Sequence, residues 1–209
     1  MWPWEHAIVG YLVYSLVSRL YYRESPDGPE ALAAVVASVL PDVVDKPLAW
    51  ELEVFETGYA LGHSIFFAVP LGIAAGLLTR SLGRTRAGVA FAIGYLLHLP
   101  SDILDGYLRG GVVYPEIVLW PVATVPTRSR AQGLFDQFFE FFARYRDELV
   151  AGDLSTYRTV QIALAVGAVL VWLADGAPVL RECLAGVKRL VLGLGGRNDR
   201  SKAGPGNRE

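Results

Sequence analysis

The sequence predicts an all-α protein, a multi-pass membrane helix bundle with a metal site at one end and an interfacial amphipathic helix. Hydrophobic residues make up 53% of the 209 residues and charged residues only 19%, whereas soluble domains have about 25% charged residues. Mean hydropathy is +0.35. Long uncharged runs recur along the chain, and its three histidines all lie close to the ends of apolar stretches. These observations together favour a membrane protein with one polar site.

Four apolar segments are expected in the first half of the chain, at residues 7–22, 30–40, 58–79 and 87–101. The first lies between tryptophans and tyrosines, which often anchor helices at the membrane interface. The second is too short to span a bilayer and should end at Pro41, because helices tend to end before proline. The third is 22 residues long and is the clearest transmembrane segment. The fourth should end at Pro100.

The second half of the chain contains fewer apolar runs. Residues 48–57 are expected to form an exposed connection, and residues 103–130 to be irregular. Residues 131–150 place phenylalanines among charges, which predicts an amphipathic helix at the membrane interface. Residues 159–174 form the last uncharged span, and Pro178 begins a weaker amphipathic helix. The tail from Gly195 is rich in Gly, Arg and Asn, which predicts disorder.

Charge and cysteine content exclude some classes of function. The formal net charge is −2, so no broad basic surface favours nucleic acid, and no nucleic-acid partner is expected. The only cysteine, Cys183, excludes an internal disulfide. The lipid bilayer is the expected partner, and the sequence does not identify a protein partner.

The histidines and nearby acids are the candidate functional residues. His98 and Asp102 are four residues apart and would share one face of a helix. An imidazole and a carboxylate so placed can hold a divalent metal. Two other stretches have the same polar character at the end of an apolar run, one with His63 and one with Asp42 and Asp45. These aspartates could instead be turn or cap residues beside the prolines. Asp45 is the candidate catalytic base, or alternatively a residue that orients a ligand.

Connecting the four segments up and down places the candidate residues at one end of the bundle: His6, Asp42, Asp45, His63, His98 and Asp102. The basic turns, with Arg19 and Arg23 and with Arg80, Arg84 and Arg86, fall at the opposite end. Positively charged loops tend to be cytoplasmic. The metal site would then face away from the cytoplasm.

The favoured function is a membrane-bound metal-dependent hydrolase of phosphoester or lipid-headgroup substrates. A bound cation would activate water and polarise the scissile group. Mixed nitrogen and oxygen ligands suit zinc, with manganese or iron as alternatives. Two other functions stay open: a membrane transporter or proton-relay protein, and an inactive membrane scaffold that binds a partner through residues 103–157.

The ordered motifs resemble those of the YdjM-type family over about residues 1–125. They are His6-Ala-x-x-Gly10, Leu40-Pro-Asp-x-x-Asp45, His63-Ser64, His98-x-x-x-Asp102 and Trp120-Pro121. Members are described as inner-membrane-associated metal-dependent hydrolases, some of them LexA-binding, and are distantly similar to zinc phospholipase C and P1-type nucleases.

The resemblance implies a multi-pass protein of the inner (plasma) membrane. The sequence as a whole is expected to form a membrane-bound, hydrolase-like helical domain at 1–157, a C-terminal membrane helix and amphipathic helix at 158–194, and a disordered tail at 195–209. The implied metal ligands are His6, Asp42, His63, His98 and Asp102. Family members often carry a His-Arg pair shortly before the His-Ser motif, where this chain has Gly58 and Tyr59.

Overall fold

The computed structural model describes residues 1–125, 133–152 and 155–200, and within these ranges the chain is helical and contains no strand. The expected all-α class is therefore confirmed. The elements are α1 (Pro3–Val17), the π-helical turn η1 (Ser18–Tyr22), α2 (Gly28–Trp50), α3 (Ile65–Ser81), α4 (Thr85–Gly110), the 3-10 turn η2 (Pro115–Val118), α5 (Leu134–Val150), α6 (Thr156–Ala174) and α7 (Leu180–Arg200).

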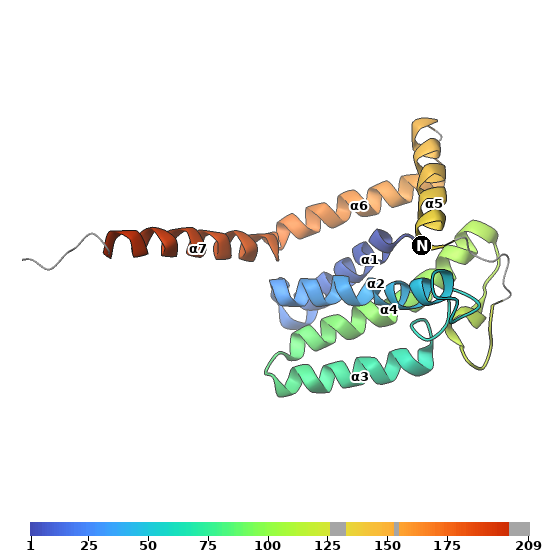
Figure 1. Ribbon diagram of the computed structural model, residues 1–209, viewed down its shortest axis with the longest axis horizontal. Helices are drawn as coiled ribbons and strands as arrows, with labels where there is room; N and C mark the ends of the chain where they lie inside the picture. The colour runs from blue at the N-terminus through green and yellow to red at the C-terminus, as the bar shows by residue number, and fades with distance from the viewer. Residues whose placement is uncertain (126–132, 153–154, 201–209) are drawn as a thin grey trace, which may run out of the picture.

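Helices α1 to α4 run side by side and form the body of the molecule (Figure 1). Helix α4 packs against α1, α2 and α3, and α6 lies along α1. Helix α5 runs crosswise at one end of this bundle, and α7 extends beyond the other end (Figure 1). The crosswise course of α5 is consistent with the amphipathic interfacial helix expected at residues 131–150.

Small residues let the central helices approach closely. Ala34 and Ala37 of α2 and Ala90 of α4 are completely buried. A Cβ atom added at Gly10 would lie 2.8 Å from Ser38 Cβ, and one added at Gly94 would collide with the Ala34 carbonyl oxygen. Small residues of this kind allow backbone contact between helices where the surrounding solvent is lipid. The close packing matters for the site because it fixes α1 and α4 against the middle of α2.

Two of the described helices are long and apolar enough to cross a membrane, namely α4 and residues 157–174 of α6. Helix α3 is apolar but has only 17 residues. Large apolar side chains remain exposed on α3 and α6, including Ile73, Leu77 and Leu170. An apolar surface of this extent is typical of contact with lipid. The span expected at residues 159–174 is confirmed as a helix.

The expected end of the second segment at Pro41 is wrong. Helix α2 continues through Pro41 and Pro47 and ends at Trp50. Proline removes one helical hydrogen bond, and packing compensates for that loss, since Pro41 is fully buried. The continuation places Asp42 and Asp45 on a helix rather than in a turn.

Helix α4 likewise passes Pro100 and ends at Gly110, so the expected end at Pro100 is wrong. Gly111 follows with a positive φ of 69°, which is a common way for a helix to end. Residues 103–110 are consequently helical rather than irregular. His98 and Asp102 lie in the middle part of a long helix, with two more turns beyond them.

The third segment is shorter than expected, because residues 58–64 form a loop and α3 begins at Ile65. The backbone N–H groups of Ala60, Gly62 and His63 point to the Asp45 carboxylate. N–H groups bound in this way are not available to a helix. The loop brings His63 to the bundle interior.

The other helix boundaries differ less from those expected from the sequence. Helix α1 begins at Pro3, and residues 18–22 form a π-helical turn. Helix α5 covers residues 134–150 of the expected 131–150, and residues 131–132 lie outside the described part of the chain. Helix α7 continues to Arg200, past Gly195, where the tail was expected to begin. Residues 201–209 lie outside the described ranges.

Candidate metal centre

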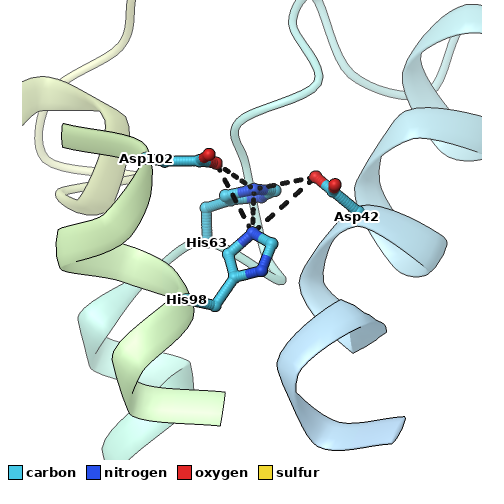
Figure 2. Close-up of side chains that lie close together, drawn as sticks. All are labelled: Asp42, His63, His98 and Asp102. Atoms are coloured by element: carbon cyan, nitrogen blue, oxygen red, sulfur yellow. Dashed lines mark hydrogen bonds and ion pairs between the residues drawn. The ribbon is translucent and has the colours of Figure 1, made fainter. Parts of the chain in front are cut away.

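Four buried side chains from three segments converge at one point in the bundle (Figure 2). Asp42 comes from α2, His63 from the loop before α3, and His98 and Asp102 from α4. One ligand atom from each residue lies within 4.8 Å of all the others. The side chains of both histidines are fully buried, and those of both aspartates are 3% exposed. Segments far apart in sequence therefore build one enclosed polar cluster.

The spacing of these atoms fits shared ligation of one cation. The two Nε2 atoms of His63 and His98 are 3.0 Å apart. His63 Nε2 lies 3.4 Å from Asp42 Oδ1 and 3.3 Å from Asp102 Oδ2. His98 Nε2 lies 3.7 Å and 3.4 Å from the same two oxygens. Ligands at about 2.0–2.1 Å around a tetrahedral ion would be about 3.3 Å from each other.

Each of the two imidazoles is held from behind by a hydrogen bond at Nδ1. His98 Nδ1 lies 2.7 Å from the Ser38 carbonyl oxygen, and His63 Nδ1 lies 2.8 Å from Asp45 Oδ2. Nδ1 carries the hydrogen in both contacts, because both partners are acceptors. Backbone and carboxylate acceptors behind a ligating imidazole are the usual way that proteins orient such ligands. The result is that both Nε2 atoms face the cluster.

The facing Nε2 atoms require a positive charge between them. In the neutral tautomers both would present lone pairs at 3.0 Å. Although burial lowers the pKa of His63, contacts with Asp102, Asp42 and Asp45 outweigh burial and raise this pKa to about 10 in the metal-free protein. Protonation of His63 and metal binding at this position would therefore compete. The two flanking carboxylates favour a divalent cation.

Asp45 belongs to the support of this cluster. It is fully buried, and its carboxylate accepts hydrogen bonds from the backbone N–H groups of Ala60, Gly62 and His63 at 2.8–3.0 Å. Gly62 is required here, since an added Cβ would lie 2.8 Å from the Pro41 carbonyl oxygen. Of the two roles expected for Asp45, these contacts favour orientation of His63 over proton transfer.

His6 lies beside the four-residue cluster rather than within it. Its ring stacks on that of His98 with centroids 3.7 Å apart, and its Nε2 is 3.1 Å from Asp102 Oδ1. Neither ring nitrogen of His6 has a partner at hydrogen-bonding geometry, and the same is true of both Asp42 oxygens. Buried polar atoms are normally paired. These atoms have ion-pair contacts, such as that of Asp42 Oδ2 with Lys46, but no well-aligned hydrogen bond, which fits an additional ligand such as a metal ion.

Asp102 uses its two oxygens in different directions. Oδ2 faces His63 and His98, whereas Oδ1 faces His6 and the amino group of Met1, which is 3.0 Å away. The same amino group is 3.0 Å from Asp105 Oδ2. All five expected ligands thus lie together at one end of the bundle, as the up-and-down topology predicted. Arg86, in one of the basic turns, lies at the other end and pairs with Glu24.

The sequence did not predict several contacts that support the cluster. Tyr95 is fully buried and donates its hydroxyl to the Gly62 carbonyl at 2.8 Å. Ser64 Oγ donates to the Trp120 carbonyl at 2.6 Å, which connects two of the short motifs. The Ser38 carbonyl is a backbone group, so the residue type at position 38 does not indicate its contact with His98. Of these, only Ser64 and Trp120 lay within recognisable motifs.

A cavity of about 870 Å³ adjoins the cluster and is partly lined by Asp42 and Asp105. Lys46 also lines it, with Nζ 2.6 Å from Asp42 Oδ2. Gly58 and Tyr59, at the positions where the resemblance implied a His-Arg pair, are lining residues too. The Tyr59 ring contacts the His63 ring with centroids 4.9 Å apart. Burial, reinforced by Asp102 and Asp42, raises the pKa of the Tyr59 hydroxyl, so it stays protonated.

The family model described as YdjM inner membrane protein matches residues 1–178. The chain belongs to the YdjM family. The match covers α1 to α6 and therefore the whole candidate metal centre and its adjoining cavity. It also extends beyond the first 125 residues on which the sequence motifs lie. No curated protein and no solved structure matches the chain. Membership of the YdjM family, with two candidate membrane spans, supports a location in the inner membrane.

Proposed function

We propose that this chain is a membrane-bound, metal-dependent hydrolase that acts on phosphoester or lipid-headgroup substrates. The observation that carries this proposal is the convergence of two imidazoles and two carboxylates in a buried cluster beside a cavity. Ionisable groups next to hydrocarbon cost free energy and are usually retained for function. YdjM-family membership supports the membrane setting.

The proposed ligands are Asp42, His63, His98 and Asp102, with His6 as a fifth ligand on the Asp102 Oδ1 side. Zinc is the favoured metal because the contact distances suit nitrogen and oxygen ligation of one ion by the four clustered residues, and His6 would expand the coordination to five. Manganese and iron accept the same ligand types. A divalent ion held here would supply Lewis-acid polarisation of a phosphoryl oxygen and activate a water molecule.

Two residues of the chain have proposed roles around the substrate. Lys46 places its ammonium group 2.6 Å from Asp42 and within the cavity, where it would bind an anionic oxygen of the substrate. Asp45 would hold the His63 ring in the ligating orientation through its 2.8 Å contact with Nδ1. Asp45 can orient His63 in this way while it keeps its hydrogen bonds to the backbone.

The proposed arrangement in the membrane is multi-pass, with α1 to α4 and α6 crossing or entering the bilayer side by side (Figure 1). The end that carries Arg80, Arg84 and Arg86 would be cytoplasmic under the positive-inside rule. The metal centre would then open on the opposite side.

An inactive scaffold is the second candidate, and one specific observation favours it. Gly58 and Tyr59 stand where family members often have His-Arg, and both line the cavity beside the cluster. Loss of a substrate-binding cation there would remove activity and leave the metal centre intact. A phosphodiesterase assay with added zinc or manganese separates the two candidates, since turnover would exclude the scaffold.

Metal analysis of the purified full chain tests the proposal. We expect about one bound ion per chain in the wild type and loss of that ion in His98→Ala. Ser101→Ala is the matched control, because Ser101 lies one turn away on α4 and bonds only to the Leu97 carbonyl among the described contacts. Equal, near-zero metal content in all three proteins would overturn the proposal.

A further inference from the structure

The cavity beside the metal centre has a polar end. Asp42 and Lys46 line it next to the cluster, and Asp105 and Arg109 line it nearby. Arg109 is paired with Asp105 at 2.9 Å and also donates to the Tyr157 hydroxyl at 2.7 Å. The cavity volume of about 870 Å³ falls within the range of about 300–1,000 Å³ that is typical of ligand sites.

The rest of the cavity wall is apolar and largely aromatic. Val43 and Trp50 of α2 form one side, and Phe135, Phe138 and Phe139 of α5 form another. Trp2 contributes as well, and its ring lies edge-on to that of Phe138 with centroids 6.2 Å apart. Walls of this composition suit a hydrocarbon chain, and the few polar groups at one end would fix its orientation.

We infer that this cavity binds a membrane lipid with a phosphate-bearing headgroup, with the phosphate at Lys46 beside the metal centre and a hydrocarbon chain against the phenylalanines of α5. Lys46 Nζ lies where the polar end of the cavity meets its apolar wall, 2.6 Å from Asp42 Oδ2 and 5.8 Å from the Trp50 ring centroid. The inference rests on the proposed function, in which a divalent ion neutralises the clustered carboxylates. The Lys46 ammonium group is then available to an anion.

The position of α5 supports entry of such a lipid from the bilayer. The helix runs crosswise at the end of the bundle where the N-terminus and the cavity lie (Figure 1). Phe135 and Phe139 line the cavity and are also 70% and 61% exposed. An amphipathic helix with apolar side chains so exposed lies in the interface, with that face in the acyl region. The same phenylalanines can therefore contact both the bilayer and the bound chain.

Binding titrations of the full chain in detergent test the inference with two probes that share a headgroup. Dihexanoyl phosphatidic acid carries two short chains, and glycerol 3-phosphate carries none. We expect the lipid to bind about tenfold or more tightly, because each buried methylene adds favourable free energy. Comparable affinities would overturn the inference and indicate a soluble phosphoester instead.

Two pairs of variants locate the bound lipid. Val43→Trp would fill the cavity, and we expect about a tenfold loss of lipid affinity with little change for glycerol 3-phosphate. Val36→Trp is its control, because Val36 is also exposed on α2 but does not line the cavity. Lys46→Ala should weaken both probes, whereas Lys188→Ala on α7 should weaken neither. Normal lipid binding by Val43→Trp would overturn the inference.

Repeating the titrations with and without chelator separates this inference from the proposed function. Lipid binding that needs the metal supports both. Chain-dependent lipid binding by a protein without metal or turnover supports the lipid site and contradicts the hydrolase. Metal content and turnover without chain-dependent binding would leave the hydrolase standing and overturn the lipid site.

Discussion

At the scale of single residues, the metal centre depends as much on the groups behind the imidazoles as on the ligands. The Ser38 carbonyl and the Asp45 carboxylate each hold one Nδ1, and Asp45 is itself held by three backbone N–H groups. A free histidine side chain would lose conformational entropy on binding a metal. In the candidate metal centre that cost is met during folding, because both imidazoles are already held in place.

The substitution Asp45→Asn tests whether Asp45 orients His63 or transfers a proton. As an orienting residue, Asp45 should give a variant whose metal affinity is about 10–100-fold weaker, because such supporting contacts typically contribute that much. Competition with a chromophoric zinc chelator would measure the affinity. Unchanged affinity combined with lost turnover would instead assign Asp45 to proton transfer.

Gly62→Ala should destabilise the protein by about 1–3 kcal/mol, because overpacking of a close contact costs that much. The added methyl group would lie 2.8 Å from the Pro41 carbonyl oxygen, which is backbone and cannot rotate away. Thermal unfolding in detergent is the measurement. Gly167→Ala is the control, since its added Cβ meets nothing within 4 Å, and a similar loss there would contradict the explanation.

At the scale of elements, α6 is attached to α1 by one buried carboxylate at the end away from the metal centre. Asp175 accepts from the Tyr11 hydroxyl at 2.6 Å and the Ser15 hydroxyl at 2.7 Å. It also pairs with Arg19, whose Nε lies 2.9 Å from Oδ1. Because Asp175 is only 2% exposed, its charge is balanced mainly by these three residues. The contacts fix α6, which has exposed apolar side chains, to the bundle.

Asp175→Asn should lower the stability of α6 packing by about 1.5–3 kcal/mol, the usual contribution of hydrogen bonds to a charged group. Limited proteolysis between α5 and α6 and the thermal midpoint would both report the change. Metal content should stay at the wild-type level, because the residue lies at the other end of the bundle. Asp147→Asn, at a 67% exposed ion pair, should have little effect on either measurement.

At the scale of the whole molecule, the candidate ligands and the basic turns occupy opposite ends of one helical bundle. The metal end contains the N-terminus of α1, helix α5 and the loop that precedes α3 (Figure 1). Arg84 and Arg86 lie at the other end, where Arg86 stacks over the Tyr22 ring at 4.5 Å. Short, positively charged turns favour the cytoplasmic side of a membrane, although Arg109 and Arg158 lie at the metal end, so the orientation needs a direct test.

Cysteine labelling in intact cells should show that the two ends lie on opposite sides of the membrane. After Cys183→Ser removes the native thiol, Glu56→Cys should react with a membrane-impermeant maleimide from outside. Arg84→Cys should react only after the membrane is permeabilised, because positively charged turns stay cytoplasmic. Both positions are exposed. The reverse labelling pattern would place the metal centre in the cytoplasm.

Much of the site was predictable because its ligands are chemically unusual for this chain. Three histidines stand out in an apolar sequence, since ionisable groups beside hydrocarbon are rarely kept without a function. The alternation of helices then placed them at one end. The helix boundaries were less predictable. Pro41 and Pro100 suggest helix ends from local propensity, but tertiary packing carries α2 and α4 through them. Backbone acceptors such as the Ser38 carbonyl have no signature in sequence at all.

The four clustered ligands differ in how firmly the chain holds them. Asp42, His98 and Asp102 project from α2 and α4, which contact each other through Gly94 and Ala34. His63 alone projects from an irregular segment. Any adjustment to ions of unequal radius would therefore fall on that segment, since sliding α2 past α4 would disrupt their packing. In the proposed metal centre, the range of ions that could be accepted would therefore depend mainly on residues 58–64.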